Sequence, residues 1–89
     1  MPVRILRIVN EKGLHARASA KLVEVVEAHD ADAEIRRDQM VASGDSIMGL
    51  LMLAASRGSE IEVETTGPEA DALADALERL VADRFGEGM

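Results

Sequence analysis

One histidine lies where the sequence favours phosphoryl chemistry. In the segment Gly13-Leu14-His15-Ala16-Arg17, a glycine leads directly into a predicted helix, and His15 stands at the helix start. The first N–H groups of a helix lack intrahelical partners and attract anions, and the same positive end disfavours imidazolium and keeps a ring nitrogen free as a nucleophile. Arg17 can add a bidentate cation for phosphate oxygens. Phosphoryl transfer needs these parts, although spacing alone fits a solvated or capping histidine at least as well.

A second segment predicts a short helix without a polar face. Ser46 stands at its N-cap position, and capping is the simplest interpretation of that serine. Residues 47–55 are apolar apart from one glycine, and such a helix is either buried or presents an apolar surface to a partner. Full burial is difficult in so small a domain. We therefore expect a partner-facing patch that includes Ile47, Met48 and Leu51; the alternative is that the helix's methionines fill the core.

The remaining pattern predicts the elements that position these two segments. Strands are expected at residues 3–9, 31–36, 40–42 and 60–66, and helices at 16–28, 47–55 and from 68 to a stop at Gly86. Gly58 is expected to close the second helix in a left-handed conformation. In 60–66, apolar residues and threonine alternate with three glutamates that read as a solvated face. The order β-α-β-β-α-β-α predicts an α+β open-faced β-sandwich, with a four-stranded antiparallel sheet and three helices on one face.

The face that the first helix buries is also predicted from spacing. Ala16, Ala20, Val23 and Val26 recur at helical intervals and are expected to face the core.

Composition excludes several functional classes. The chain has 89 residues, which predicts one domain over residues 1–89, and a net charge of −7, which makes nucleic acid and anionic membranes poor partners. It has no cysteine, tryptophan or tyrosine, and its two histidines lack metal-ligand spacing, so we expect no metal and no cofactor. The sequence has neither a signal-peptide layout nor an apolar run of membrane-spanning length. We expect a cytoplasmic monomer.

Two segments resemble the signatures of one protein family. Residues 13–17 resemble the active-site signature of HPr, the histidine phosphocarrier of the bacterial phosphotransferase system. Ser46-Ile47-Met48-Gly49-Leu50 is similar to the family's second signature, around its regulatory serine. The distances between these segments and the order of the elements match as well, so the resemblance covers essentially the whole chain. Residues 60–68 are similar to the nitrogen-related branch, NPr, which regulates rather than imports sugar.

The resemblance implies a role for each site residue. His15 would carry the phosphoryl group on a ring nitrogen, and Ala16 and Arg17 would bind its oxygens. Enzyme I, charged from phosphoenolpyruvate, would be the donor, and a IIA-type protein would be the acceptor. Ser46 would be the target of an HPr serine kinase/phosphorylase. The protein would be a phosphoryl carrier with a phosphohistidine intermediate rather than a stand-alone enzyme. At Ala18 the sequence departs from the family, which usually has proline there.

Two other functional classes remain open from the residues. An acyl carrier protein is also small and acidic, and Asp45-Ser46-Ile47 resembles its attachment site, with Ser46 as the modified residue. That fold is all-helical, and the alternation in 60–66 argues against it. A ferredoxin-like regulatory ligand-binding domain would share the α+β class but would need no reactive histidine.

Overall fold

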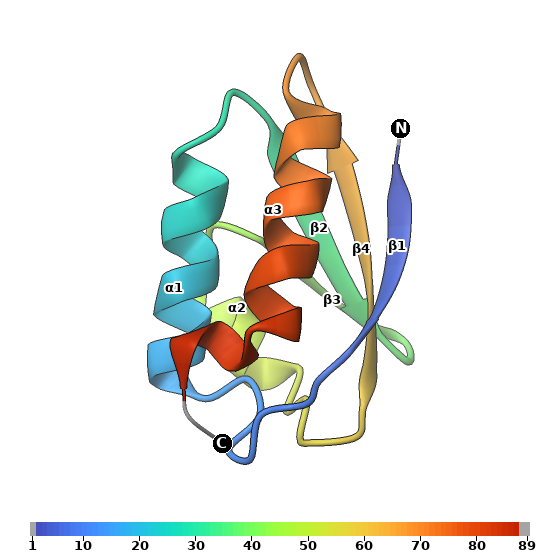
Figure 1. Ribbon diagram of the computed structural model, residues 1–89. Coiled ribbons are helices and arrows are strands. Elements are labelled where there is room, and N and C mark those ends of the chain that lie inside the picture. Colours follow the sequence, from blue (N-terminus) through green and yellow to red (C-terminus); the bar gives the residue numbers. More distant parts are fainter. Residues whose placement is uncertain (1, 88–89) are drawn as a thin grey trace.

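The computed structural model describes residues 2–87. Its elements follow one another in this order: β1 (Val3–Arg7), α1 (Ala16–Glu27), β2 (Asp32–Arg37), β3 (Met40–Ser43), α2 (Ile47–Met52), β4 (Glu60–Thr66), α3 (Ala70–Ala82) and the short 3₁₀ helix η1 (Arg84–Gly86). The predicted order β-α-β-β-α-β-α is confirmed, with η1 as an addition (Figure 1).

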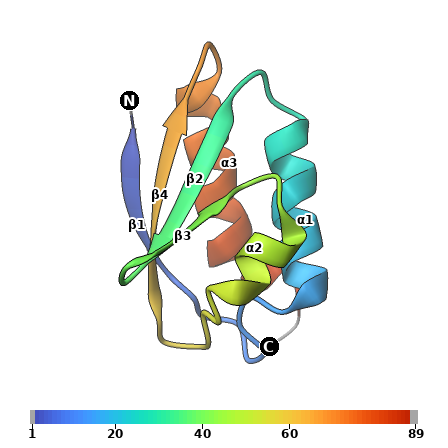
Figure 2. The same cartoon turned by 180° about the vertical axis from the view of Figure 1, so that it is seen from behind.

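The four strands form one antiparallel sheet in the order β1-β4-β2-β3. Helices α1, α2 and α3 all lie on one face of this sheet, and the other face is open (Figures 1 and 2). The predicted α+β open-faced sandwich is therefore confirmed. No helix among residues 2–87 is long and apolar enough to cross a membrane.

The core lies between the sheet and the helices. In β4 the residues Ile61, Val63 and Thr65 are buried, as their alternation predicts. Thr65 is accommodated because its hydroxyl donates to the carbonyl of Ala70 at 2.7 Å. Such a bond removes the penalty of burying a hydroxyl. The open face carries the glutamates, but Glu62 and Glu64 are not simply solvated, because Arg36 of β2 donates to both.

The predicted buried face of α1 is partly wrong. Val23 and Val26 are buried as expected, but Ala16 is exposed and Ala20 is only partly buried. The buried residues of the helix are Ala18, Ser19, Leu22, Val23 and Val26. Alanines give a weak periodic signal because they bury little area, and the large Leu22 decides which face turns inward.

The ends of the second helix also differ from the prediction. Instead of reaching residue 55, α2 ends at Met52, and Ala54 adopts a left-handed φ of 51°. The cause is tertiary, since the carbonyl of Ala55 accepts a hydrogen bond from the N–H of Leu14 at 2.8 Å. Gly58 is left-handed as expected, with φ 89°, but it lies in the turn before β4 rather than at the helix end.

Two further boundaries are shorter than predicted. Strand β1 stops at Arg7, because the following residue bonds to the loop before β4 instead of continuing the ladder. Helix α3 begins at Ala70 rather than Pro68 and ends at Ala82. The chain then leaves the helix because Arg84 and Phe85 adopt left-handed φ angles of 56° and 54°.

Candidate functional site

The loop before α1 is held in a fixed shape. Asn10 is completely buried; its side-chain amide nitrogen donates to the carbonyl of Gly13 at 2.8 Å, and its backbone carbonyl accepts from the Gly13 N–H at 3.2 Å. Gly13 has φ 66°, and a Cβ there would lie 2.5 Å from the carbonyl oxygen of Ala55. Only glycine combines that conformation with that approach. The loop therefore delivers the chain into α1 in one direction.

His15 is the N-cap residue of α1. Its backbone is extended, with φ −78° and ψ −176°, and its carbonyl accepts the first helical hydrogen bond from the N–H of Ser19 at 2.8 Å. Its side chain does not cap the helix and remains 27% exposed. The N–H groups of Ala16 and Arg17, in the exposed part of the first turn, therefore have no intrahelical partner and lie beside a partly accessible imidazole. This is the arrangement that the spacing of residues 13–17 predicts.

The imidazole of His15 contacts a carboxylate from the far end of the chain. Its Nε2 hydrogen-bonds to Oε2 of Glu87, whose other oxygen, Oε1, accepts from the side-chain amide of Asn10 at 3.0 Å. The hydrogen bond from His15, and then the one from Asn10, lower the pKa of Glu87 below its ordinary value. Since an ionised carboxylate can only accept, Nε2 is the donor in this contact, and in the tautomer with its proton on Nε2 the free lone pair lies on Nδ1.

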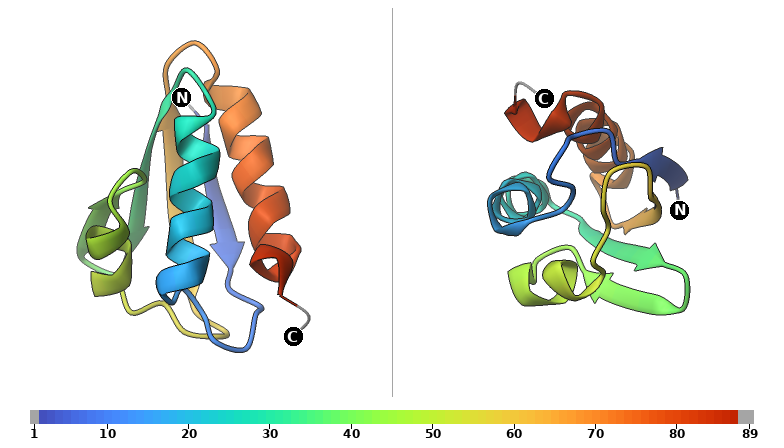
Figure 3. Two further views of the ribbon diagram at one scale, coloured as in Figure 1. Left: turned by 90° about the vertical axis from the view of Figure 1, so that its left-hand side faces the viewer. Right: turned by 90° about the horizontal axis from the view of Figure 1, so that it is seen from below.

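The tail that carries Glu87 is anchored beside α1. Phe85 is completely buried, and its carbonyl accepts from Nζ of Lys21 at 2.6 Å. Arg84, Phe85 and Gly86 are three consecutive left-handed residues, a conformation that costs roughly 1–2 kcal/mol for each residue with a side chain. Such strain persists where surrounding contacts fix it. Figure 1 shows η1 crossing beside the first turns of α1, and Figure 3 shows the same neighbourhood from two further sides.

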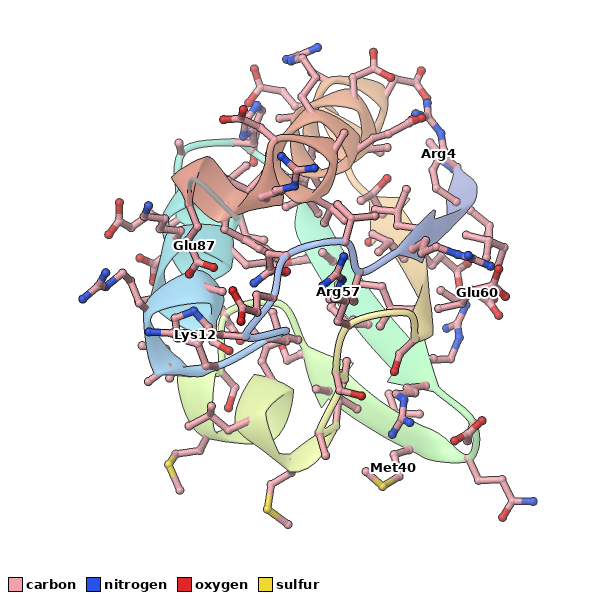
Figure 4. The ribbon with its side chains drawn as sticks, turned by 60° about the horizontal axis from the view of Figure 1, so that its bottom comes forward. Arg4, Lys12, Met40, Arg57, Glu60 and Glu87 are labelled. Atoms are coloured by element: carbon pink, nitrogen blue, oxygen red, sulfur yellow. The ribbon has the colours of Figure 1, made fainter. Side chains whose placement is uncertain are left out.

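Arg17 lies in the first turn of α1 and forms no side-chain hydrogen bond with His15. Its side chain is exposed, and it forms no ion pair with any of residues 2–87. The positive groups nearest Glu87 include Lys12 of the preceding loop, which also lowers its pKa (Figure 4). The structure thus brings His15 together with the first-turn N–H groups and Glu87, and it leaves Arg17 free to reach an incoming anion.

The second predicted segment lies at the same end of the molecule. Ser46 is the N-cap of α2, and its hydroxyl accepts from the N–H of Gly49 at 3.0 Å, so the capping interpretation is confirmed. Met48 and Met52 are each 71% exposed, which contradicts the alternative that these methionines fill the core. Ile47 is exposed, while Leu51 is partly buried. Helix α2 lies beside the first half of α1 in both views (Figures 1 and 2).

The comparisons with known proteins agree on one family. A family model described as "PTS HPr component phosphorylation site" matches residues 3–83. This chain belongs to the HPr family. Among its HPr relatives is the phosphocarrier protein HPr of Cupriavidus necator, which is 46% identical over 81 residues, covering 91% of each chain. The phosphocarrier protein NPr of Escherichia coli is 37% identical over 83 residues, covering 92% of each chain.

Solved HPr structures share the fold. HPr-C-His from Thermoanaerobacter tengcongensis superposes with a TM-score of 0.94 at 28% identity and covers 100% of both chains. HPr from Bacillus anthracis superposes with a TM-score of 0.85 at 31% identity, covering 90% of this chain and 95% of its own.

HPr membership removes the two alternative classes. The acyl carrier interpretation is wrong because the chain folds around a four-stranded sheet rather than as an all-helical bundle. The ferredoxin-like interpretation is replaced by the family match over residues 3–83.

Two residues that the structure brings into the candidate site were not among the candidates from the sequence. Glu87 is 72 positions from His15 and belongs to no periodic pattern, so no local signal could have connected the two. Asn10 reads as an ordinary turn residue in the sequence. Its position three residues before a left-handed glycine was a usable signal, because asparagine side chains commonly bond to nearby backbone groups in such turns.

Proposed function

We propose that this HPr-family domain accepts a phosphoryl group from enzyme I of the phosphotransferase system on His15 and passes it to a IIA-type protein. Nδ1 of His15 attacks the phosphorus of the donor phosphohistidine; the new N–P bond forms while the donor's N–P bond breaks, and its electron pair returns to the donor ring. The second transfer repeats this exchange with His15 as donor. The protein is a carrier, not a stand-alone enzyme.

The observation that carries the proposal is the state of His15. Its ring stands partly exposed at the N-cap of α1, and its Nε2 is occupied by Glu87, so that Nδ1 is the nitrogen with a free lone pair. The first-turn N–H groups, including that of Ala16, offer partners to phosphoryl oxygens. Arg17 is exposed in the same turn and would close on the anion once it arrives.

The surface of α2 supports a role in partner binding. Ile47, Met48 and Leu51 form part of an apolar surface on the end of the molecule that carries His15, and two methionines adapt to differently shaped partners. We therefore propose that enzyme I and the IIA-type protein both dock across α2, and that the domain serves them as a cytoplasmic monomer.

Ser46 is proposed as a regulatory site. Ser46 is partly exposed at the N-cap of α2, next to Ile47. Phosphorylation by an HPr serine kinase/phosphorylase would place a dianion at the rim of the apolar docking surface. Because a dianion is costly to desolvate, this surface would then bind a partner less well.

Labelling with phosphoenolpyruvate and enzyme I tests the proposal. The wild-type protein should take up one phosphoryl group that is lost in acid and kept in base, as expected for an N–P bond. His15→Ala should take up none. His29→Ala provides the matched control, since it removes the only other histidine of the sequence, and it should label normally. Full labelling of the His15→Ala protein would refute the assignment.

A further inference from the structure

We propose that Glu87 is a positioning residue for His15, whose carboxylate holds the imidazole with its proton on Nε2 and Nδ1 free for the phosphoryl group. This inference rests on the proposed function and adds a residue that lies outside both sequence signatures. It concerns the orientation and charge of the ring rather than the bond that forms.

The carboxylate is held at both oxygens. Oε2 accepts from Nε2 of His15, and Oε1 accepts from the amide of Asn10 at 3.0 Å. Asn10 cannot easily move, because it is completely buried and also donates to the carbonyl of Gly13. The side chain of Glu87 is only 16% exposed. The contact therefore joins the ring to the rigid loop before α1 and differs from a solvated surface pair.

The backbone of the tail preorganises this carboxylate. A residue near a chain end ordinarily samples many conformations and loses that freedom when it makes a contact. Here buried Phe85 and the Lys21 hydrogen bond to its carbonyl fix the tail two residues before Glu87. The Glu87 N–H also donates to the carbonyl of Arg84 at 2.9 Å. The left-handed run at residues 84–86 turns the chain toward α1 instead of letting it continue along α3.

The contact between Glu87 and His15 can stabilise the charge that phosphoryl transfer creates on the ring. When Nδ1 forms its bond to phosphorus, the proton on Nε2 stays in place, and the ring becomes a cation shared between its two nitrogens. A carboxylate on Nε2 compensates that cation from the side opposite to the phosphoryl group. Glu87 is suited to this task because the His15 and Asn10 hydrogen bonds keep its pKa low, so that it stays ionised at neutral pH.

The test compares the variants Glu87→Ala and Glu87→Gln with the control Asp83→Asn. The control also removes a carboxylate close to η1, but the side chain of Asp83 makes no capping hydrogen bond. In the unphosphorylated proteins, NMR of the His15 ring should show a protected Nε2–H proton in the wild type and in Asp83→Asn, and its loss in Glu87→Ala. The rate of phosphoryl transfer from enzyme I should fall about tenfold or more in Glu87→Ala, as when other ring-orienting partners are removed. Glu87→Gln should slow transfer by less, because its single oxygen can serve His15 but leaves the ring charge uncompensated.

The outcomes separate this inference from the proposed function. If the wild-type protein takes no label on His15, the proposed function fails, and the positioning role fails with it. If the wild type labels normally and both Glu87 variants keep its rate and its ring proton signal, the positioning role alone is overturned. A faster transfer in Glu87→Ala would also overturn it, because the carboxylate would then obstruct the phosphoryl position. Melting temperatures of all four proteins confirm that each is folded.

Discussion

Replacing Met48 by aspartate should separate partner binding from folding. Complete burial of a methionine side chain is worth about 1.5–3 kcal/mol. Met48 is 71% exposed, so docking could still bury about two thirds of it, a contribution of roughly 1–2 kcal/mol to the complex. Loss of that amount alone weakens binding roughly 5–30-fold. The carboxylate adds a desolvation penalty, so the expected effect is at least at the upper end of this range.

The cost to folding should be small for the same reason. The buried remainder of Met48 contributes roughly 0.4–0.9 kcal/mol to the free energy of unfolding. Position 48 lies in the first turn of α2, where a negative charge is favourable by about 0.3–1 kcal/mol and offsets the poorer helix propensity of aspartate. A shift below about 1 kcal/mol lowers the melting temperature of a domain this size by no more than about 8 °C.

The assay measures the concentration dependence of phosphoryl transfer from enzyme I alongside thermal unfolding. Met40→Asp is the matched control, because it places the same charge on an exposed methionine at the β2–β3 hairpin, away from α2 (Figure 4). Leu50→Ala calibrates the opposite case, since this residue of α2 is completely buried and should cost about 2–5 kcal/mol of stability. If Met48→Asp unfolds the protein like Leu50→Ala, or transfers like the Met40 variant, the docking argument is refuted.

Four further outcomes are expected. Arg17→Ala should keep the melting temperature, because the side chain is exposed, but slow transfer in both directions by about tenfold or more; unchanged kinetics would contradict its role. Ser46→Asp should keep the fold, since aspartate is also a good N-cap, yet reduce transfer from enzyme I; a loss explained by melting would contradict the switch. Gly13→Ala should lower the melting temperature by at least about 5 °C, since the new Cβ meets the Ala55 carbonyl at 2.5 Å; Gly58→Ala, with open space around it, should cost clearly less, and equal losses would show that the close approach is unimportant. Because Glu87 has a pKa below its ordinary 4.5 in the folded state, it stabilises the fold above that pH and loses the effect as the pH falls through the lower value; the stability gap between wild type and Glu87→Gln should therefore close in acid, and a gap independent of pH would argue against the ionised contact.

The sequence predicted the fold, and it predicted where the helix of the candidate site begins, because these signals are local. The alternation in 60–66 identified β4 and its buried face, and the glycine before His15 identified the start of α1. The boundaries that were wrong depend on tertiary contacts. Helix α2 stops at Met52 because its following residues bond to the loop before α1, and no propensity in residues 47–55 reports that bond.

The same distinction explains the turn between β2 and β3. Gln39 occupies a position where glycine would ease a hairpin, yet the turn forms because Asp38 takes the left-handed conformation, with φ 56°. Aspartate tolerates that region better than most residues, since its short side chain can bond locally. The residue with the left-handed backbone is therefore Asp38, one position before Gln39, where glycine was expected.

The segment around His15 is held rigidly although Ala18 replaces the family's usual proline, and here too the cause is a set of tertiary contacts. Ala18 is the third residue of α1, where an N–H has no intrahelical partner, so proline would remove no helical bond there and would only restrict the chain. In this protein the restriction comes from elsewhere. The loop before the helix is fixed by buried Asn10 and by the approach of Gly13 to Ala55, and the ring of His15 is tied to Glu87. Because Ala18 itself is completely buried, the first turn is packed against the core as well. The site is thus constrained by three segments that meet at one end of the sandwich: the loop before α1, the first turn of α1 and the tail that carries Glu87.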